Sequence, residues 1–146
     1  SYFTKEIENT ISQGIKINIF GDINKLSKDI RNILKRSINL TKKNKKITVN
    51  LAINYGAKNE ILSTARKIKN KINMKNFEKN LYTSNMPHPD ILIRTGGQKR
   101  LSNFMLWQLA YSELFFLKKL WPDFNQTDLR KIIKKFRNRK RNFGSI

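Results

Sequence analysis

The chain has 146 residues, a hydrophobic content of 38% and a net charge of +21 at pH 7. That length suits one domain, so we expect residues 1–146 to form a single domain with a core of its own. No run of eighteen apolar residues is present, so we expect no membrane-spanning segment. The first residues carry acids and no apolar run, so we expect no secretory leader. The absence of cysteine excludes disulfides and thiolate metal sites, and the single histidine excludes a histidine-rich metal cluster.

Hydrophobic periodicity in the first half of the chain predicts helices and strands in alternation. In chain order we expect the tail of a helix at 2–13, ended by Gly14, a strand at 15–20 before the Gly21-Asp22 turn, an amphipathic helix over 26–38, a β-branched strand at 47–54 and a helix over 61–68.

The second half continues the pattern. We expect a short helix around 75–81, a loop marked by Pro87 and Pro89, a strand at 91–94 and helices over 103–117 and 126–140. Strands separated by helical crossovers are typical of a parallel sheet. The sequence therefore predicts an α/β fold, with a parallel β-sheet flanked by helices.

The most informative segment begins at the strand over 91–94. This strand carries Arg94 into a Gly96-Gly97 turn, and Lys99, Arg100 and Ser102 follow within a few residues. Arginine offers planar, permanently charged forks, and glycine lets the backbone approach a ligand closely. From chemistry alone this segment indicates a phosphate or diphosphate site.

The same segment, IRTGG-x-x-R-x-SNF-x-LWQ-x-AY-x-EL-x-F followed by LWPDF, resembles the signature of the cis-prenyltransferases. Among these, the bacterial undecaprenyl diphosphate synthases match it most closely. The resemblance implies that the diphosphate of isopentenyl diphosphate is held by Arg94, Arg100, Ser102 and the backbone amide of Leu101. It also implies that Glu113 serves a magnesium ion, Mg²⁺.

Two of these residues have alternative roles. Ser102 could equally be the N-cap of the helix expected over 103–117. On such a helix Glu113 would lie about 16 Å from Ser102, so the two could not share one phosphate. Glu113 would then approach a magnesium from the far end of the pocket, reach the site of a neighbouring subunit, or belong to a buried polar network.

The chain departs from the family pattern at several positions. In VNLAINYGAKNEIL, which resembles the family's N-I-A-x-N-Y-G-G-R segment, Ala57 replaces the second glycine and Lys58 the arginine. In the basic C-terminal tail, which in the family reaches across a homodimer, Asn142 stands in place of an arginine. Arg139 or Arg141 could substitute for it.

Two family motifs, M-D-G-N-x-R-W and F-S-x-E-N-W, do not occur in the chain. In the family the first motif binds magnesium and the allylic diphosphate, so we expect this chain to carry only the isopentenyl-diphosphate half of an active site and to be inactive alone. The resemblance implies a homodimeric, cytoplasmic transferase with peripheral membrane contact. Such an enzyme condenses isopentenyl diphosphate onto farnesyl diphosphate with cis double bonds and makes undecaprenyl diphosphate.

The charge of +21 supports a different class of function. A strongly basic chain suits a polyanion, and the alternative hypothesis is a basic α/β nucleic-acid-binding module. Biased composition explains the charge equally well, because lysine, asparagine and isoleucine are enriched throughout. Aromatic residues do not interleave with the lysine clusters as a base-stacking surface requires.

Overall fold

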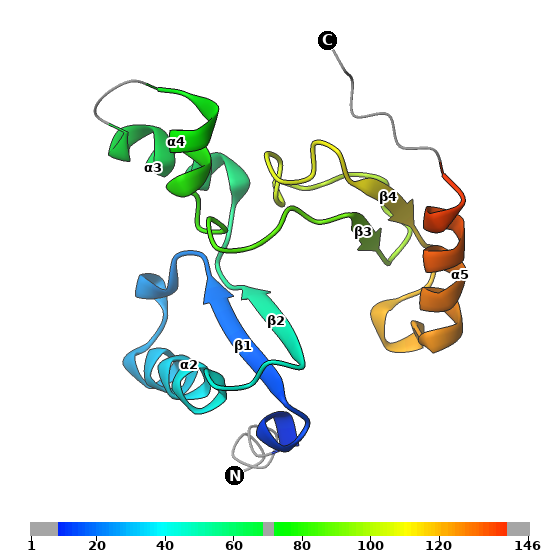
Figure 1. Cartoon of the computed structure of the whole chain (residues 1–146), viewed down its shortest axis with the longest axis horizontal. Coiled ribbons are helices and arrows are strands. Elements are labelled where there is room, and N and C mark those ends of the chain that lie inside the picture. The colour runs from blue at the N-terminus through cyan, green and yellow to red at the C-terminus, as the bar shows by residue number, and fades with distance from the viewer. Residues whose placement is uncertain (1–8, 69–71, 140–146) are drawn as a thin grey trace. The chain divides into compact units, whose positions relative to one another are not determined.

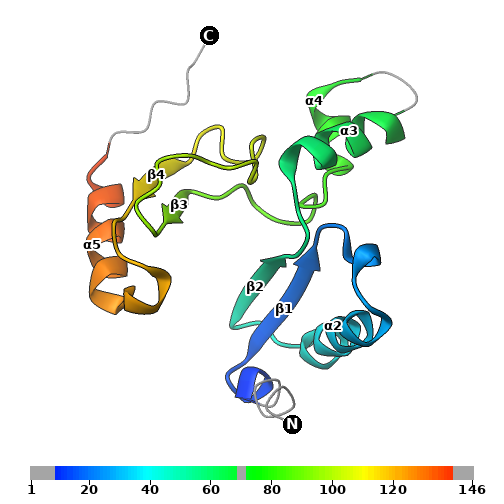
Figure 2. The same cartoon turned by 180° about the vertical axis from the view of Figure 1, so that it is seen from behind.

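Two pairs of parallel strands form the framework of the computed structural model, which describes residues 9–68 and 72–139. The chain divides into two compact units, Ser1–Ser84 and Asn85–Ile146. Each unit holds one strand pair with helices beside it (Figures 1 and 2). The predicted α/β class, with parallel strands flanked by helices, is confirmed. That residues 1–146 form one domain stays a prediction.

The first unit follows the predicted order of elements. Residues 9–12 are helical and lead to Gly14, while the rest of the helix expected at 2–13 lies outside the described residues. The elements that follow are β1 (Ile15–Phe20), the short 3₁₀ helix η1 (Ile23–Lys25), α2 (Lys28–Thr41), β2 (Ile47–Ala52), α3 (Ala57–Lys67) and α4 (Met74–Lys79).

Strands β1 and β2 pair in parallel, with Ile15 opposite Ile47 and Phe20 opposite Ala52. A side chain of helix α2 satisfies one backbone donor of β1. The backbone amide of Ile17 donates a hydrogen bond to the Thr41 hydroxyl at 3.0 Å. At the end of β1, Gly21 has φ +116°, and a Cβ there would lie 2.1 Å from the carbonyl oxygen of Ile53. Only glycine lets the two strand ends approach this closely.

Strand β2 is exposed along its whole length, including Ile47, Val49 and Leu51. It therefore contributes a hydrogen-bond ladder more than it contributes to the core. The buried apolar side chains of this unit come mostly from its helices and the loops around them: Phe20, Leu34, Ala57, Phe77 and Leu81.

A buried acid fixes the start of α3. The Glu60 side chain is fully buried and accepts from the Tyr55 hydroxyl at 2.5 Å and from the Tyr82 backbone amide at 2.8 Å. A buried carboxylate needs such donors to offset its lost hydration. Glu60 thereby joins the loop after β2 to the segment after α4.

The second unit contains β3 (Ile91–Arg94), β4 (Glu113–Phe116), the short 3₁₀ helix η2 (Trp121–Asp123) and α5 (Gln126–Arg137). Strands β3 and β4 pair in parallel, with Ile91 opposite Glu113 and Arg94 opposite Phe116. The buried apolar residues of this unit are Leu109, Phe115 and Ile132. No helix of the described residues has the length and apolarity needed to cross a membrane.

The helix predicted over 103–117 is wrong. The segment forms turns up to Tyr111 and then the strand β4. Ser102, Asn103 and Met105 have φ of 49°, 63° and 47°, values outside the right-handed helical region. Leu114 and Phe115 therefore face their neighbours with the two-residue period of a strand, and Ser102 caps no helix.

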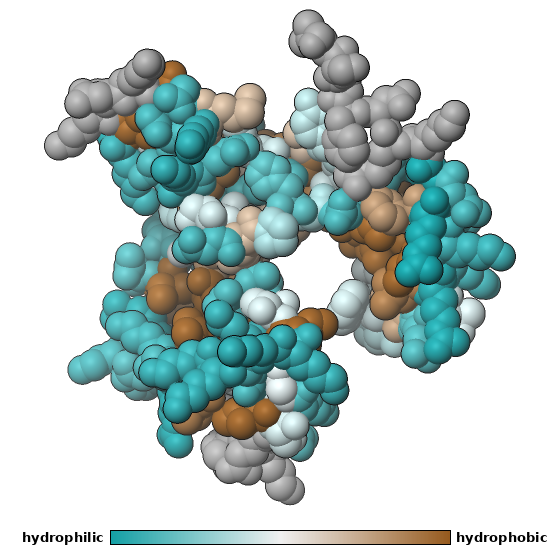
Figure 3. All heavy atoms as spheres, viewed as in Figure 1, coloured by the Kyte–Doolittle hydropathy of each residue, from teal (hydrophilic) through white to brown (hydrophobic). Residues whose placement is uncertain are grey.

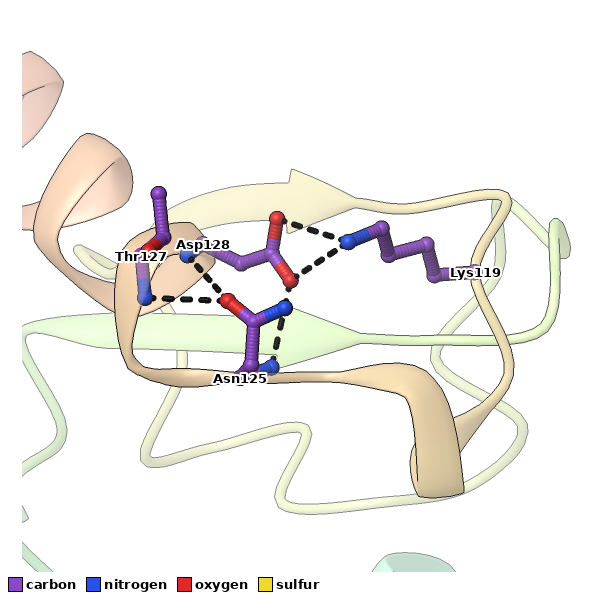
Figure 4. A network of polar contacts seen from close by, with 4 residues as sticks. All are labelled: Lys119, Asn125, Thr127 and Asp128. Carbon is purple, nitrogen blue, oxygen red and sulfur yellow. Dashed lines mark hydrogen bonds and ion pairs between the residues drawn. The ribbon is translucent and has the colours of Figure 1, made fainter.

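Four residues stabilise the N-terminus of α5, as Figure 4 shows. The Asn125 side chain accepts from the amides of Thr127 and Asp128, and the Asp128 carboxylate accepts from the Asn125 amide at 3.1 Å. This is a reciprocal capping box, which satisfies amides that a helix start leaves unpaired. Lys119 adds contacts of 3.1 and 2.8 Å to the two oxygens of Asp128.

Because of this network, the thermal stability of the protein should depend on pH in the acidic range. The hydrogen bond from Lys119, and then that from the Asn125 amide, lower the pKa of Asp128 below its usual value of 3.8. A carboxyl whose pKa is lower folded than unfolded stabilises the fold above its unfolded pKa, and this stabilisation is lost as pH falls through the folded value. Asp128→Asn should therefore lower the Tm at neutral pH, and its deficit should shrink at pH values below 3.8.

Thermal unfolding measured across that pH range checks the expectation. Asp123→Asn, the same change at the neighbouring acid in η2, is the matched control and should leave the acid dependence as in the wild type. A deficit of Asp128→Asn that stays constant down to the lowest pH would contradict the role of the Lys119–Asp128 pair.

Candidate diphosphate-binding site

The loop after β3 is held by backbone hydrogen bonds. Gly96 and Gly97 have φ of +85° and +75°. In that conformation the Gly96 amide donates to the Lys119 carbonyl at 2.7 Å and the Gly97 amide to the Leu117 carbonyl at 2.8 Å. These two amides are thus engaged within the chain. The glycines shape the turn, while side chains remain to bind an anion.

Arg94, the last residue of β3, organises the rest of the loop. Its Nη1 donates to the Ser102 hydroxyl at 3.0 Å and also to the Arg100 carbonyl. One guanidinium therefore closes a ring over residues 94–102. The Ser102 hydroxyl therefore lies beside the guanidinium of Arg94.

A hollow of about 290 Å³ lies at this loop. Its lining includes all four residues for which the sequence predicts diphosphate contact, together with three apolar neighbours: Leu92, Ile93, Arg94, Arg100, Leu101, Ser102 and Phe104. The lining contains two guanidinium groups and no carboxylate. Such a hollow suits an anion with several oxygen atoms.

Arg100 differs from Arg94 in the hydrogen bonds that its side chain makes. Its side chain is exposed, and its guanidinium makes no hydrogen bond or ion pair with any residue in 9–68 or 72–139. Arg94 is thus partly used to shape the loop, whereas within the described residues no partner occupies the donors of Arg100.

The backbone at Ser102 is strained. Ser102, Asn103 and Met105 all occupy the left-handed region, which residues other than glycine rarely adopt. Such conformations persist where the surroundings impose them, and they concentrate at binding sites. Here the hydrogen bond from Arg94 holds Ser102 in place.

Glu113 does not join this cluster. It is the first residue of β4 and lies opposite Ile91, three residues before the position of Arg94 in register. With a rise near 3.3 Å per residue, this puts Glu113 about 10 Å from Arg94 along the strand direction. The helix on which Ser102 and Glu113 were expected to lie about 16 Å apart is absent, and Glu113 is not among the residues that line the hollow after β3.

The Glu113 carboxylate forms an ion pair with Arg139, whose guanidinium also lies 5.1 Å from the centre of the Phe115 ring. Arg139 is one of the two arginines considered as substitutes in the C-terminal tail, and within this chain it contacts Glu113. Arg141 and Asn142 lie outside the described residues. In this structure the Glu113 carboxylate is therefore neutralised by the Arg139 guanidinium.

The fit to magnesium rests on Glu113 alone. Among residues 9–68 and 72–139 no group of three acids or histidines could hold a metal ion. Magnesium is often bound by one or two carboxylates together with substrate phosphates. Glu113 fits as one such ligand of a metal that a diphosphate also binds, once Arg139 releases the carboxylate.

The two departures in the first unit lie at the start of α3. Ala57 is its first residue and is buried, so the methyl group that replaces a glycine hydrogen is packed inside the unit. Lys58 follows it on the exposed side.

Sequence reasoning missed β4 and the partner of Glu113. The run Glu113-Leu-Phe-Phe, preceded by Ser112 and followed by two lysines after Leu117, is short, bulky and bounded by polar residues, which is a strand signal. No local pattern reveals the Arg139 contact, because 26 positions separate it from Glu113.

The hollow lies at the carboxyl end of a parallel strand, which is where α/β proteins as a class bind their ligands. Comparison with protein families is more specific. The family described as "Putative undecaprenyl diphosphate synthase" matches residues 1–144. The chain therefore belongs to the undecaprenyl diphosphate synthase family of cis-prenyltransferases.

Individual relatives agree. The chain is 43% identical to an isoprenyl transferase of Rickettsia bellii, with 98% of this chain and 65% of the relative covered. It is 39% identical to the farnesyl-diphosphate-specific ditrans,polycis-undecaprenyl-diphosphate synthase of Haemophilus influenzae, covering 96% and 63%. The chain thus spans less than two thirds of the length of these curated relatives.

Solved structures show the same likeness. A probable undecaprenyl diphosphate synthase from Campylobacter jejuni is 35% identical, with a TM-score of 0.88 over 98% of this chain and 69% of that one. Lavandulyl diphosphate synthase from Lavandula x intermedia, in complex with dimethylallyl diphosphate, is 32% identical, with a TM-score of 0.91 over 99% and 67%.

Arg94→Lys tests the hollow directly. Lysine keeps the charge but cannot hold Ser102, the Arg100 carbonyl and a ligand oxygen with one planar fork. We expect the affinity for inorganic diphosphate to fall about 10- to 100-fold, because hydrogen bonds to charged groups contribute about 1.5–3 kcal/mol. Calorimetric titration of wild type and variant measures the change.

Arg36→Lys, the same substitution at an exposed arginine of α2, is the matched control and should bind diphosphate as the wild type does. Equal affinity of Arg94→Lys and wild type would show that Arg94 does not contact the anion.

Proposed function

We propose that this chain supplies the isopentenyl-diphosphate half of a cis-prenyltransferase active site. The observation that carries the proposal is the acid-free hollow formed by Arg94, Arg100, Leu101 and Ser102 after β3, in a chain of this family. The diphosphate would accept from both guanidinium groups, the Ser102 hydroxyl and the Leu101 amide. The isopentenyl group would be held where its terminal carbon can attack.

The reaction joins two prenyl units. The C4 carbon of isopentenyl diphosphate forms a bond to C1 of an allylic diphosphate such as farnesyl diphosphate. The allylic C–O bond breaks, the allylic diphosphate leaves, and a proton departs from C2 of the isopentenyl unit. Repetition with cis double bonds gives a long-chain product such as undecaprenyl diphosphate. This chain's part is to fix the nucleophile, which removes translational and rotational freedom before bond formation.

The other half of the reaction needs groups that these 146 residues do not carry. No M-D-G-N-x-R-W segment is present to hold the allylic diphosphate, so we expect no prenyl transfer by this chain alone. Magnesium, when bound, would neutralise charge on a departing diphosphate. Glu113 would contribute one oxygen to it, either at the far end of the pocket or in the site of a second subunit of a homodimer.

Peripheral contact with a membrane is part of the proposal, because a long polyprenyl product is itself a lipid. The nucleic-acid alternative has net charge as its support, and no feature of the hollow favours it.

Arg100→Ala in the full-length protein tests the function. Because the Arg100 guanidinium forms no hydrogen bond or ion pair with a residue in 9–68 or 72–139, its loss should leave the loop intact. We expect the KM for isopentenyl diphosphate to rise about 30- to 150-fold, equivalent to about 2–3 kcal/mol, with the KM for farnesyl diphosphate unchanged. Steady-state kinetics with each substrate varied in turn measures both constants.

Arg36→Ala, at an exposed arginine of α2, serves as the control and should change neither constant. If Arg100→Ala raised both constants equally, the hollow would not be selective for the nucleophile, and the assignment of the two diphosphates would be wrong.

Glu113→Gln tests the metal assignment. An amide binds hard cations poorly, so the magnesium concentration required for half-maximal turnover should rise about tenfold or more. A magnesium titration of kcat in the full-length protein measures it. The companion variant Arg139→Gln removes the competing cation and should shift the requirement the other way. A lowered Tm with an unchanged titration curve would place Glu113 in a structural network instead.

A further inference from the structure

Helix α5 presents a continuous cationic face. Arg130, Lys134 and Arg137 are all exposed and, together with Ile133 and Asn138, line a shallow hollow of about 250 Å³. We call these three cations the α5 cationic face. Lys131 and Lys135 are also exposed and extend the charge around the helix.

Helical geometry explains why the three charges lie together. Positions 130, 134 and 137 fall within an arc of roughly 60° at 100° per residue. Ile132, on the opposite side, is buried with 4% exposure and anchors the helix to its unit. In Figure 3, which has the view of Figure 1, the spheres over α5 are almost entirely hydrophilic.

This charge is not compensated within the described part of the chain. The one acid of α5, Asp128, is paired with Lys119 at the start of the helix. Arg130, Lys134 and Arg137 form no ion pair with a residue in 9–68 or 72–139. Like charges at this spacing repel one another, so an anionic surface that spans all three would be bound favourably.

We propose that the α5 cationic face docks on a membrane surface that carries anionic phospholipid headgroups. The choice of a lipid partner rests on the proposed function, whose product is a long prenyl chain that must enter a bilayer. A row of lysine and arginine residues on an amphipathic helix is the arrangement that anionic headgroups attract.

Two features of the same unit agree with a lipid surface. Leu120 and Trp121, which precede α5, are 62% and 72% exposed, and tryptophan is enriched at the boundary between headgroups and acyl chains. The hollow beside the α5 cationic face is also lined by no aromatic residue. A surface for single-stranded nucleic acid would combine its cations with aromatic rings for base stacking.

The experiment is co-sedimentation of the full-length protein with vesicles. Phosphatidylcholine vesicles that contain phosphatidylglycerol should bind the protein, pure phosphatidylcholine vesicles should not, and added salt should weaken binding. The triple variant Arg130→Gln, Lys134→Gln, Arg137→Gln should partition about 100-fold less, since each cation near an anionic leaflet contributes a factor of about five.

A second triple variant is the matched control. Lys28→Gln, Lys35→Gln and Arg36→Gln remove the same charge from exposed positions of α2, and binding should stay within about threefold of wild type. Circular dichroism should confirm that both variants are folded. An equal loss in the two variants would show that total charge drives binding and would overturn the proposal.

Two further outcomes are distinguishable. If the α5 variant kept its vesicle binding but lost binding to a single-stranded oligonucleotide, the face would serve nucleic acid and the proposal would be wrong. Binding of isopentenyl diphosphate without vesicles tests the proposed function separately. If the protein did not bind isopentenyl diphosphate but its vesicle binding depended on α5, the proposed function would be refuted and membrane docking by the α5 cationic face would be supported.

Discussion

The candidate site depends on the extension of the β3–β4 ladder beyond both ends of two very short strands. The Glu113 amide donates to the Asp90 carbonyl before the pair begins, and the Leu117 amide to the Arg94 carbonyl where it ends. Gly96 and Gly97 then fold back onto the segment after β4. A pair of four-residue strands is marginal by itself. The added bonds fix the direction in which Arg94 leaves β3, and with it the position of Ser102.

Lys119 connects this loop to the last helix. Its carbonyl oxygen accepts from Gly96, and its ammonium group pairs with Asp128 in the capping box of α5. The turn that shapes the hollow after β3 and the start of α5 therefore share one residue. At the other end of α5, Arg139 pairs with Glu113 of β4. Both ends of the helix are thus tied to the strand pair, which explains how a surface helix can keep a fixed cationic face.

Sequence periodicity was sufficient for most of the fold and insufficient for one segment. The strands β1 and β2 show a clear two-residue period in their sequence, and the helices α2, α3 and α5 show a helical period because each has buried residues on one side. The segment over 103–117 is apolar enough for a helix, yet its outcome is decided by pairing with β3, a contact between distant residues that overrides local propensity. The hollow was predictable in composition, since Arg94, Arg100, Leu101 and Ser102 lie close in sequence. The sequence also predicted that Glu113 lies apart from the hollow. The distance could not be predicted, because it depends on whether Glu113 stands on a helix or, as observed, on a strand.

The net charge of +21 has one effect at long range and another at short range. At long range the summed field attracts any anion and raises encounter rates with diphosphates, membranes and nucleic acids alike, and salt screens it within about 10 Å. At short range, selectivity requires cations fixed at defined positions without competing acids. Two places in the second unit meet that condition in different ways. The hollow after β3 is lined by two guanidinium groups close together, an arrangement that suits a small anion such as diphosphate. The cations of α5 lie in a row along the helix, an arrangement that suits an extended anionic surface. The same excess of basic residues can therefore serve a substrate and a surface without one site competing for the ligand of the other.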